Sequence, residues 1–353
     1  MENEFTVLDR TLLNAVQQSF PLTEEPFAVL GAPLGLSGDA VVEKLAAMKR
    51  LNVLREISAI FDSRRLGYQS CLVAMRFPED RLTEAALRIN AYPGVSHNYA
   101  RDAYFNLWFT VAVGPGESLE GIVAALAVQT MPERYRLLPA LRTFKIGVMF
   151  DMVAEEGASQ LDSAQGSPEN ASLLEPLSLE ERDLVRLLQE DLPLIPHPFA
   201  PVAKTLGLTQ SQLFAHLDDL KRRGILRRFG GVLRHRRAGF KGNGMAVWRV
   251  PCQDAERIGM IMATHPAVSH CYQRLTYAEW PYSHFTMVHA TSKERCLEIV
   301  RDIASQTGIT EYQVFFSHRE FKKTRVRYFT GKGAPCLPTT PSSWTSKVAV
   351  ASS

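Results

Sequence analysis

The sequence predicts an α+β fold that is built twice, each half being a winged helix-turn-helix followed by a ferredoxin-like βαββαβ domain. Three observations predict this fold. The chain repeats its own motifs between two halves. Each half opens with short amphipathic helices and then alternates between strand and helix periodicities. A length of 353 residues also exceeds a typical single core.

The internal repeat covers nearly the whole of each half. Near each start, a Pro-Leu pair is followed by a Pro-Phe pair: Pro21-Leu22 and Pro26-Phe27, then Pro193-Leu194 and Pro198-Phe199. Farther on, residues 92–101 correspond to residues 265–274, and both stretches contain Val-Ser-His-x-Tyr-x-Arg. The spacing between the copies is one residue longer at the second motif. The pattern predicts a duplication with small insertions.

The winged units are predicted from helix caps, amphipathic spacing and a basic strand pair. The predicted helices are residues 39–50 in the first half and residues 179–190, 199–206 and 209–223 in the second. Residues 227–237, Arg-Arg-Phe-Gly-Gly-Val-Leu-Arg-His-Arg-Arg, then predict a hairpin with Gly230-Gly231 at its bend. Residues 55–65 predict the matching hairpin of the first half.

The ferredoxin-like units are predicted from period-2 strands that flank helices. The second half gives strands at 244–250, 267–275 and 282–290, helices at 254–264 and 292–306, and a last strand from Tyr312. The first half gives strands at 70–77, 94–102 and 106–113 and a final strand within 142–150.

These patterns divide the chain into consecutive predicted segments. They are a winged unit at 1–66, a ferredoxin-like domain at 67–151, a flexible linker rich in Ser, Ala, Glu and Gly at 152–177, a second winged unit at 178–238, a second ferredoxin-like domain at 239–330 and a disordered tail at 331–353.

The overall composition indicates a cytoplasmic protein without a membrane span. Lys and Arg total 40 against 37 Asp and Glu, a net charge of +3, so local clustering of charge is more informative than the total. No apolar run approaches the roughly 20 residues that a membrane span needs, and the acidic start does not resemble a secretory signal. The 5 cysteines are scattered without a Cys-x-x-Cys spacing, so they give no zinc or iron–sulfur signature.

The basic stretch 227–237 implies an anionic partner, either a nucleic acid or a small polyacid. Specific DNA binding is not expected, because the third helix of each winged unit carries acidic residues on its outward side: Asp39, Glu43, Asp218 and Asp219. The first hairpin also has Glu56 and Asp62 where the second has Arg228 and Arg234. This asymmetry predicts one productive polyacid site, in the second half, and one degenerate copy.

Histidines on the predicted strands supply further candidates. Alternate side chains of a strand share a face. The His-x-Tyr-x-Arg motif of residues 97–101 therefore places its named residues on one face, and the copy at 270–274 does the same. His284 and His289 lie five residues apart on one strand and are expected on opposite faces.

A winged helix followed by a small ferredoxin-like domain resembles the Lrp/AsnC family of transcription regulators. Specific motifs resemble one branch, the siroheme decarboxylases, more closely. The first half resembles one subunit type in Ile57-Ser-Ala-Ile-Phe-Asp-Ser63, Gly67-Tyr68, Gly94-Val-Ser-His-Asn-Tyr99 and Asn106-Leu-Trp-Phe-Thr110. The second half resembles the other type in Arg228-Phe-Gly-Gly-Val-Leu-Arg-His-Arg236, Gly239-Phe240, Trp280-Pro-Tyr282 and Met287-Val-His289. In that family the two types occur separately or fused, and this chain resembles the fused form.

The resemblance implies an enzyme, a carboxy-lyase of heme d1 biosynthesis. Siroheme decarboxylases remove carbon dioxide from the two acetate side chains of siroheme and give 12,18-didecarboxysiroheme. No cofactor is implied beyond the iron of the siroheme substrate. Other proteins of the heme d1 pathway are implied as partners. The two halves are expected to form an intramolecular pseudo-dimer that associates further as a homo-oligomer.

The candidate site residues follow from the charges, the strand motifs and the resemblance. Proton donors are expected among His97, His270 and Tyr272. The side chains expected to bind siroheme are Arg227, Arg228, Arg234, His235, Arg236, Tyr99, Arg101, Arg274, Trp280, Tyr282, His284 and His289. An axial ligand to the siroheme iron is expected from His97, His270 or His289. The sequence does not divide these roles among the histidines, and a DNA-binding regulator or a tetrapyrrole sensor stays an alternative.

Overall fold

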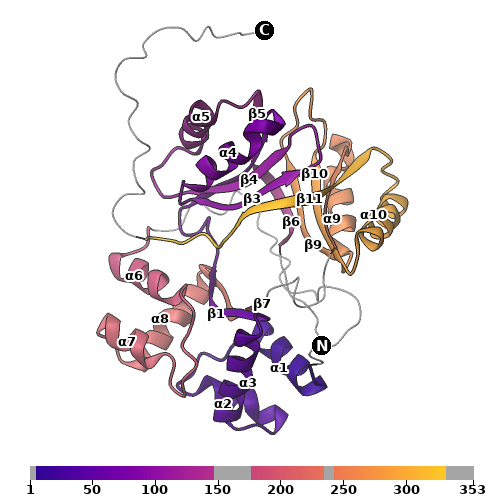
Figure 1. The fold of residues 1–353 in the computed structure, drawn as a ribbon. Helices are drawn as coiled ribbons and strands as arrows, with labels where there is room; N and C mark the ends of the chain where they lie inside the picture. The colour runs from indigo at the N-terminus through magenta and orange to yellow at the C-terminus, as the bar shows by residue number, and fades with distance from the viewer. Residues whose placement is uncertain (1–4, 147–175, 234–241, 331–353) are drawn as a thin grey trace, which may run out of the picture.

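The structure, a computed structural model, describes residues 5–146, 176–233 and 242–330. It has two lobes (Figure 1). The helical lobe holds the short helices of both halves around a 2-stranded sheet, and the sheet lobe holds a 9-stranded sheet covered by helices. Most of the predicted linker, the predicted tail and residues 234–241 lie outside the described residues. Within the described ranges, no helix combines the length and apolar character needed to cross a membrane.

The helical lobe combines two helix-turn-helix units, one from each half. Its helices are α1 (Val7–Gln18), α2 (Pro26–Gly31), α3 (Gly38–Arg50), α6 (Leu179–Leu188), α7 (Ala200–Leu206) and α8 (Gln210–Arg222). Each predicted helix of these units agrees with an observed one to within two residues at either end. Side-chain caps fix four of the starts, because the hydroxyls of Thr6, Ser37, Ser178 and Thr209 accept hydrogen bonds from the first turn.

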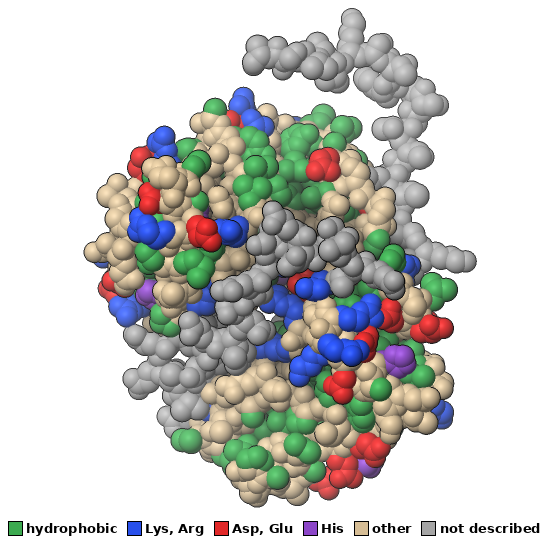
Figure 2. Space-filling model, turned by 180° about the vertical axis from the view of Figure 1, so that it is seen from behind, with side chains coloured by type: hydrophobic (Ala, Val, Ile, Leu, Met, Phe, Trp, Pro, Cys, Tyr) green, Lys and Arg blue, Asp and Glu red, His purple; other side chains and the backbone are tan. Residues whose placement is uncertain are grey.

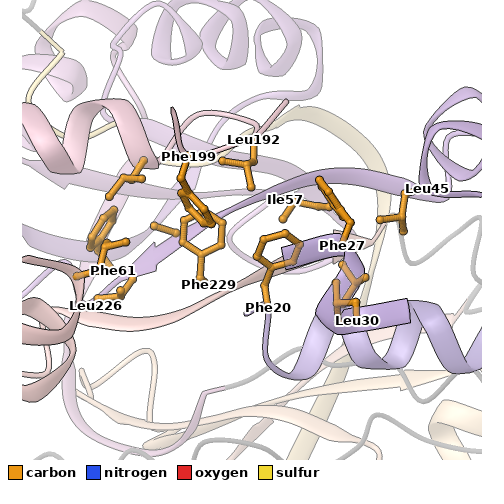
Figure 3. Packing of buried hydrophobic residues seen from close by; sticks show 14 of the residues in the cluster. Phe20, Phe27, Leu30, Leu45, Ile57, Phe61, Leu192, Phe199, Leu226 and Phe229 are labelled. Carbon is orange, nitrogen blue, oxygen red and sulfur yellow. The ribbon is translucent and has the colours of Figure 1, made fainter. Parts of the chain in front are cut away.

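One hydrophobic core spans both halves of the helical lobe. Phe20 and Phe27 from the first half meet Phe199 and Phe229 from the second, as Figure 3 shows. The ring centroid of Phe20 lies 5.5 Å from that of Phe27 and 5.7 Å from that of Phe229. Since the same aromatic cluster is shared, the two winged units are packed as one body.

Strands β1 (Leu54–Phe61) and β7 (Leu226–Leu233) pair with each other in antiparallel register, one from each half. The predicted hairpins are therefore wrong: Gly230 and Gly231 lie within β7 and form no bend, and the partner of each described strand lies in the other half. Gly230 and Gly231 sit inside β7 because α1 passes close to them. A Cβ on Gly230 would lie 2.9 Å from the backbone oxygen of Val16, which leaves room for glycine only.

Replacing Gly231 by Val is expected to destabilise the helical lobe by about 1–3 kcal/mol, because overpacking a filled core forces its neighbours to move. A Cβ at this position would lie 2.6 Å from Cγ1 of Val16, which is fully buried. Urea unfolding measures the change in the free energy of unfolding. Gly121→Ala, on the exposed side of a helix, is the control and should change stability much less, because its Cβ would meet the exposed Ser118 at 3.3 Å and not a filled core. Equal stability of the Gly231→Val variant and the parent would contradict this packing.

The sheet lobe is one continuous antiparallel sheet. Its strands are β2 (Gln69–Arg76), β3 (Val95–Arg101), β4 (Leu107–Val113), β5 (Arg134–Leu138), β6 (Ala140–Ile146), β8 (Gly242–Trp248), β9 (Val268–Arg274), β10 (His284–Ala290) and β11 (Tyr312–Lys323). Their order is β5-β2-β4-β3-β11-β8-β10-β9-β6. Each half lends its last strand to the other, since β6 pairs with β9 and the end of β11 pairs with β3. The sequence pattern did not predict β5.

The sheet has an outer face covered by helices and an inner face that encloses its own core. Helices α4 (Glu79–Asn90) and α5 (Leu119–Thr130) cover the first half, and α9 (Ala255–Thr264) and α10 (Lys293–Thr307) cover the second. The inner face collects apolar side chains from both halves, among them Trp108 and Trp280. The edge strands β5 and β6 are joined directly through Pro139, so the sheet curves back on itself.

Residues 324–330, here called the strap, connect the two lobes after β11. Arg325 donates from Nη1 to Oε1 of Glu56 on β1 at 2.7 Å. Farther along, the backbone nitrogen of Tyr328 donates to the side-chain oxygen of Gln189 at 2.7 Å, and Gln189 donates back to the carbonyl of Tyr328 at 2.9 Å. The strap thereby fixes the sheet lobe against both winged units.

Candidate active site

Two His-Tyr-Arg ladders line the inner face of the sheet. The first ladder is His97, Tyr99 and Arg101 on β3, and the second ladder is His270, Tyr272 and Arg274 on β9. The residues that alternate with them turn toward the helices. Asn98 donates to the carbonyl oxygen of Ala86 in α4 at 3.1 Å, and Cys271 packs in the core under α9. The ladder side chains therefore share the opposite face, as their spacing predicts.

The arginines of both ladders point inward and meet no carboxylate among the described residues. Arg101 is 5% exposed, and its Nη1 donates to the carbonyl oxygen of Phe315 at 3.2 Å. The guanidinium carbon of Arg274 lies 4.7 Å from the ring centroid of Tyr272, and its Nη1 donates to the carbonyl oxygen of Leu138. Burial lowers the pKa of both arginines, that of Arg101 to about 10. These two side chains are therefore buried cations without a compensating carboxylate among the described residues.

A serine precedes each ladder histidine and bonds to it. Oγ of Ser96 lies 3.0 Å from Nδ1 of His97, and Oγ of Ser269 lies 2.9 Å from Nδ1 of His270. Ser269 also lies 2.8 Å from Nε2 of His289, which shares the inner face. Because these serines occupy Nδ1, Nε2 of each ladder histidine is the nitrogen left to meet a ligand.

Cations from both lobes surround the ladder histidines. Burial is the main cause that lowers the pKa of His97 to about 4, and the charges of Lys323 and Arg55 add to it. Burial also lowers the pKa of His270 to about 4, with contributions from His97, Arg274, Arg227 and Lys145. Arg55 and Arg227 belong to β1 and β7, so the site lies where the lobes meet. Figure 2 shows Lys and Arg side chains gathered at this junction.

The free energy of unfolding is expected to fall as the pH is lowered from about 6.5 to 4. The unfolded chain protonates His97 and His270 near their ordinary pKa, whereas the folded protein protonates them only near pH 4. The unfolded state therefore binds more protons in this window, and each histidine contributes up to about 3 kcal/mol of the loss. Urea unfolding at several pH values measures it. The double variant His97→Gln, His270→Gln should show a shallower dependence, and an unchanged slope would contradict the burial of these rings.

The remaining predicted residues divide into several groups. Arg227 lies near the second ladder, since its charge helps to lower the pKa of His270. Arg228 instead donates from Nη1 to the carbonyl oxygen of Gln17 at 2.6 Å, at the end of α1, so the structure does not bring it into the site. Arg234, His235 and Arg236 lie outside the described residues.

His284, Trp280 and Tyr282 also stand apart from the ladders. His284 is fully buried on the outer face, where its Nε2 lies 2.8 Å from the carbonyl oxygen of Ala255 in α9, so its predicted role in binding is not supported. Trp280 is 3% exposed and packs 5.3 Å from the ring centroid of Trp108 in the inner core, with Tyr282 beside it. These two aromatic residues pack in the hydrophobic core of the inner face, away from the ladder histidines.

Several cations and the two serines were missed by sequence reasoning. Arg55 occupies the position in the repeat that Arg227 occupies in the second half, so closer comparison of the copies would have found it. Ser96 and Ser269 stand in the repeated Val-Ser-His motif. Lys323 gave no signal, because its approach depends on β11, which crosses from the other half. Lys145 lies near His270 but donates to the carbonyl oxygen of His265 at 3.0 Å, on the side of the sheet that α9 covers.

Two family models match the chain, each in both halves. A siroheme decarboxylase NirDL-like HTH domain matches residues 9–55 and 181–227. An AsnC-like ligand binding domain matches residues 65–145 and 237–322. The duplication that the sequence predicts is therefore a duplication of both domains.

Relatives of the whole chain decide its family. The siroheme decarboxylase of Hydrogenobacter thermophilus is 38% identical over 331 residues, which are 94% of this chain and 96% of that protein. The chain belongs to the siroheme decarboxylase family. Within this family, a crystal structure of the siroheme decarboxylase NirDL in co-complex with an iron-uroporphyrin III analogue matches with a TM-score of 0.71 and 34% identity, over 91% of this chain and 94% of that one.

Members of the siroheme decarboxylase family also occur as shorter subunits. The beta subunit of Methanosarcina barkeri is 43% identical over 144 residues, which are 41% of this chain and 95% of that subunit. One half of this chain is thus comparable to a complete subunit. The two halves, which share one core and one sheet, form an intramolecular pseudo-dimer.

Proposed function

We propose that this protein is a siroheme decarboxylase, which removes carbon dioxide from the two acetate side chains of siroheme and gives 12,18-didecarboxysiroheme for heme d1 biosynthesis. The observation that carries the proposal is the pair of inward-facing arginines, Arg101 and Arg274, which meet no carboxylate among the described residues. A buried cation without an anionic partner is unfavourable, and a polycarboxylate ligand supplies the missing charge. Membership of the family supplies the reaction.

Binding is expected to use two levels of cations. Arg101 and Arg274 lie deepest on the inner face, and Arg55 and Arg227 approach from the helical lobe. Guanidinium groups bind carboxylates through two parallel hydrogen bonds, which fixes the orientation of the ligand as well as its affinity. The relative crystallised with an iron-uroporphyrin III analogue supports a ligand of this class.

The reaction needs an electron sink and a proton donor. The carbon–carbon bond breaks as carbon dioxide leaves, the electron pair is accepted by the macrocycle, and the methylene carbon then takes a proton. An arginine on the departing carboxylate would stabilise the ground state, so the scissile acetate is expected to face a histidine or tyrosine. Burial raises the pKa of Tyr272, which keeps its hydroxyl protonated. His97, His270 and Tyr272 are the candidate donors at the site.

The negative charge of siroheme is expected to protonate the ladder histidines. In the ligand-free protein, burial and neighbouring cations hold the pKa of His97 and of His270 at about 4, so both rings are neutral at pH 7. Carboxylates that neutralise the cations raise these pKa values and favour imidazolium, the form that donates a proton. The iron belongs to the substrate, and the proposal includes no other cofactor.

The regulator alternative is not supported by the helical lobe. A helix-turn-helix reads DNA with its recognition helix in the major groove and through contacts to phosphates. Here the third helices expose Asp39, Glu43 and Asp218, whose negative charge opposes phosphate. The surfaces that would contact DNA therefore carry acidic side chains.

Anaerobic incubation of the purified protein with siroheme tests the proposal. We expect two molecules of carbon dioxide per siroheme, with a product whose mass corresponds to 12,18-didecarboxysiroheme. Tight binding of siroheme without release of carbon dioxide would instead identify a tetrapyrrole sensor. Recovery of unbound and unchanged siroheme would contradict the proposal.

A further inference from the structure

The two halves hold their ladder histidines differently. In the second half, Oγ of Ser269 lies 2.9 Å from His270 Nδ1, 2.8 Å from His289 Nε2 and 3.3 Å from the carbonyl oxygen of Met287. In the first half, the hydroxyl of Ser96 has one hydrogen-bonding partner within the described residues, Nδ1 of His97 at 3.0 Å.

The difference arises from one position in the repeat. The backbone nitrogen of His289 donates to the carbonyl oxygen of Ala267 at 3.0 Å, and that of Ala112 donates to Gly94 at 2.9 Å. Ala267 and Gly94 each stand two residues before the serine of their motif. His289 and Ala112 are therefore equivalent, and the second half has an imidazole where the first has a methyl group.

The hydroxyl proton distinguishes the two arrangements. A serine hydroxyl has one proton to donate and two lone pairs that accept. Ser269 donates to the carbonyl oxygen of Met287, so its lone pairs are available for N–H groups of His270 and His289. Ser96 has no such carbonyl among the described residues, so its proton goes to Nδ1 of His97. Ser269, in the second half, therefore accepts a hydrogen bond from its ladder histidine, His270. Ser96, in the first half, donates a hydrogen bond to its ladder histidine, His97.

We infer that His270, and not His97, delivers the proton in the decarboxylation, with Ser269 as the positioning residue that holds its ring and His289 as the partner that holds Ser269. The inference rests on the proposed function and assigns its chemistry to the second half. As carbon dioxide leaves, the macrocycle accepts the electron pair, and the methylene carbon then takes the proton from Nε2 of the His270 imidazolium, which becomes neutral with its remaining proton on Nδ1. The Nδ1–H bond to Ser269 persists before and after the step, so the ring does not turn. Solvent returns one proton for each carbon dioxide released.

Ser96 and Ser269 are both deeply buried, so replacing either one by Ala removes a hydroxyl from a similar environment. Ser269 is fully buried and Ser96 is 4% exposed, and each precedes its histidine on an equivalent strand. The cations around His270 are Arg274, Arg227 and Lys145, and the titratable His97 ring also lies near it. All of these cations are retained when Ser269 is changed, so an effect on rate reports the hydrogen bond.

The test compares Ser269→Ala with Ser96→Ala in the full chain, using anaerobic siroheme. Partners that orient a metal-bound histidine are worth about 10–100-fold, and we expect Ser269→Ala to lower kcat by a similar factor. The Kd for siroheme, from an absorption titration, should change by less than about twofold because the arginines are untouched. Ser96→Ala should change the Kd for siroheme more than kcat, because the Ser96 hydroxyl holds the His97 ring, which borders the site.

A second variant keeps the test decisive if Ser269→Ala does not fold. His289→Ala gives the second half the residue found in the first, and it should lower kcat with little change in Kd. Equal losses in the Ser96 and Ser269 variants, or unchanged kcat in both the Ser269 and His289 variants, would overturn the inference while leaving the proposed function intact. Absence of carbon dioxide release by the unmodified protein would contradict the proposed function itself.

Discussion

Replacing His270 by Gln is expected to lower the rate of siroheme decarboxylation by about 10²–10⁴-fold, the usual contribution of a general acid. The Nε2 nitrogen of His270 is the one left to face a ligand, because Nδ1 is bonded to Ser269 at 2.9 Å. Gln retains polarity and approximate size but cannot donate an acidic proton. Single-turnover kinetics under anaerobic conditions measure the rate, and mass spectrometry of the products separates single from double decarboxylation.

Two controls accompany this variant. His318→Gln changes an exposed histidine on β11 and should leave the rate unchanged. His97→Gln should weaken siroheme binding more than it slows turnover, since its ring borders the site without the carbonyl-backed serine of the second half. A larger loss of kcat in the His97 variant than in the His270 variant would move the proton donor to the first half.

Replacing Arg101 or Arg274 by Met is expected to weaken siroheme binding by about 10–100-fold each, because a hydrogen bond to a charged group contributes about 1.5–3 kcal/mol. The same changes should raise the stability of the ligand-free protein. Each arginine is buried against backbone carbonyls without a carboxylate among the described residues, and burial lowers the pKa of both. Removing such a charge relieves its desolvation.

The opposite signs of these two effects make the prediction specific. Absorption titration gives the Kd for siroheme, and thermal unfolding gives the stability of the ligand-free protein. Arg249→Met removes an exposed arginine that pairs with Glu311 at 2.9 Å, and it should change neither quantity appreciably. Loss of stability together with unchanged binding would show that Arg101 and Arg274 are structural.

The ladders were predictable from sequence because they depend on local rules. Alternation along a strand places His97, Tyr99 and Arg101 on one face whatever the sheet pairs with. The same alternation places His270, Tyr272 and Arg274 on one face in the second half. The helix starts were predictable for the same reason, since Thr209 and its equivalents cap helices through bonds three residues away.

The features that failed depend on contacts between the halves. Gly230-Gly231 predicts a turn if only neighbours are considered, yet the glycines are required by the close approach of α1. The partner of β7 is β1, which is remote in the chain and gives no local signal. The strap and the bond between Ser269 and His289 likewise join residues that sequence spacing does not relate.

A crystal structure of the protein with siroheme, prepared without oxygen, would show directly where the substrate binds. We expect the macrocycle on the inner face of the sheet between the lobes. Its carboxylates should lie within hydrogen-bonding distance of Arg101 and Arg274, and one acetate should face His270. A macrocycle bound elsewhere, or one whose carboxylates avoid both arginines, would contradict the account.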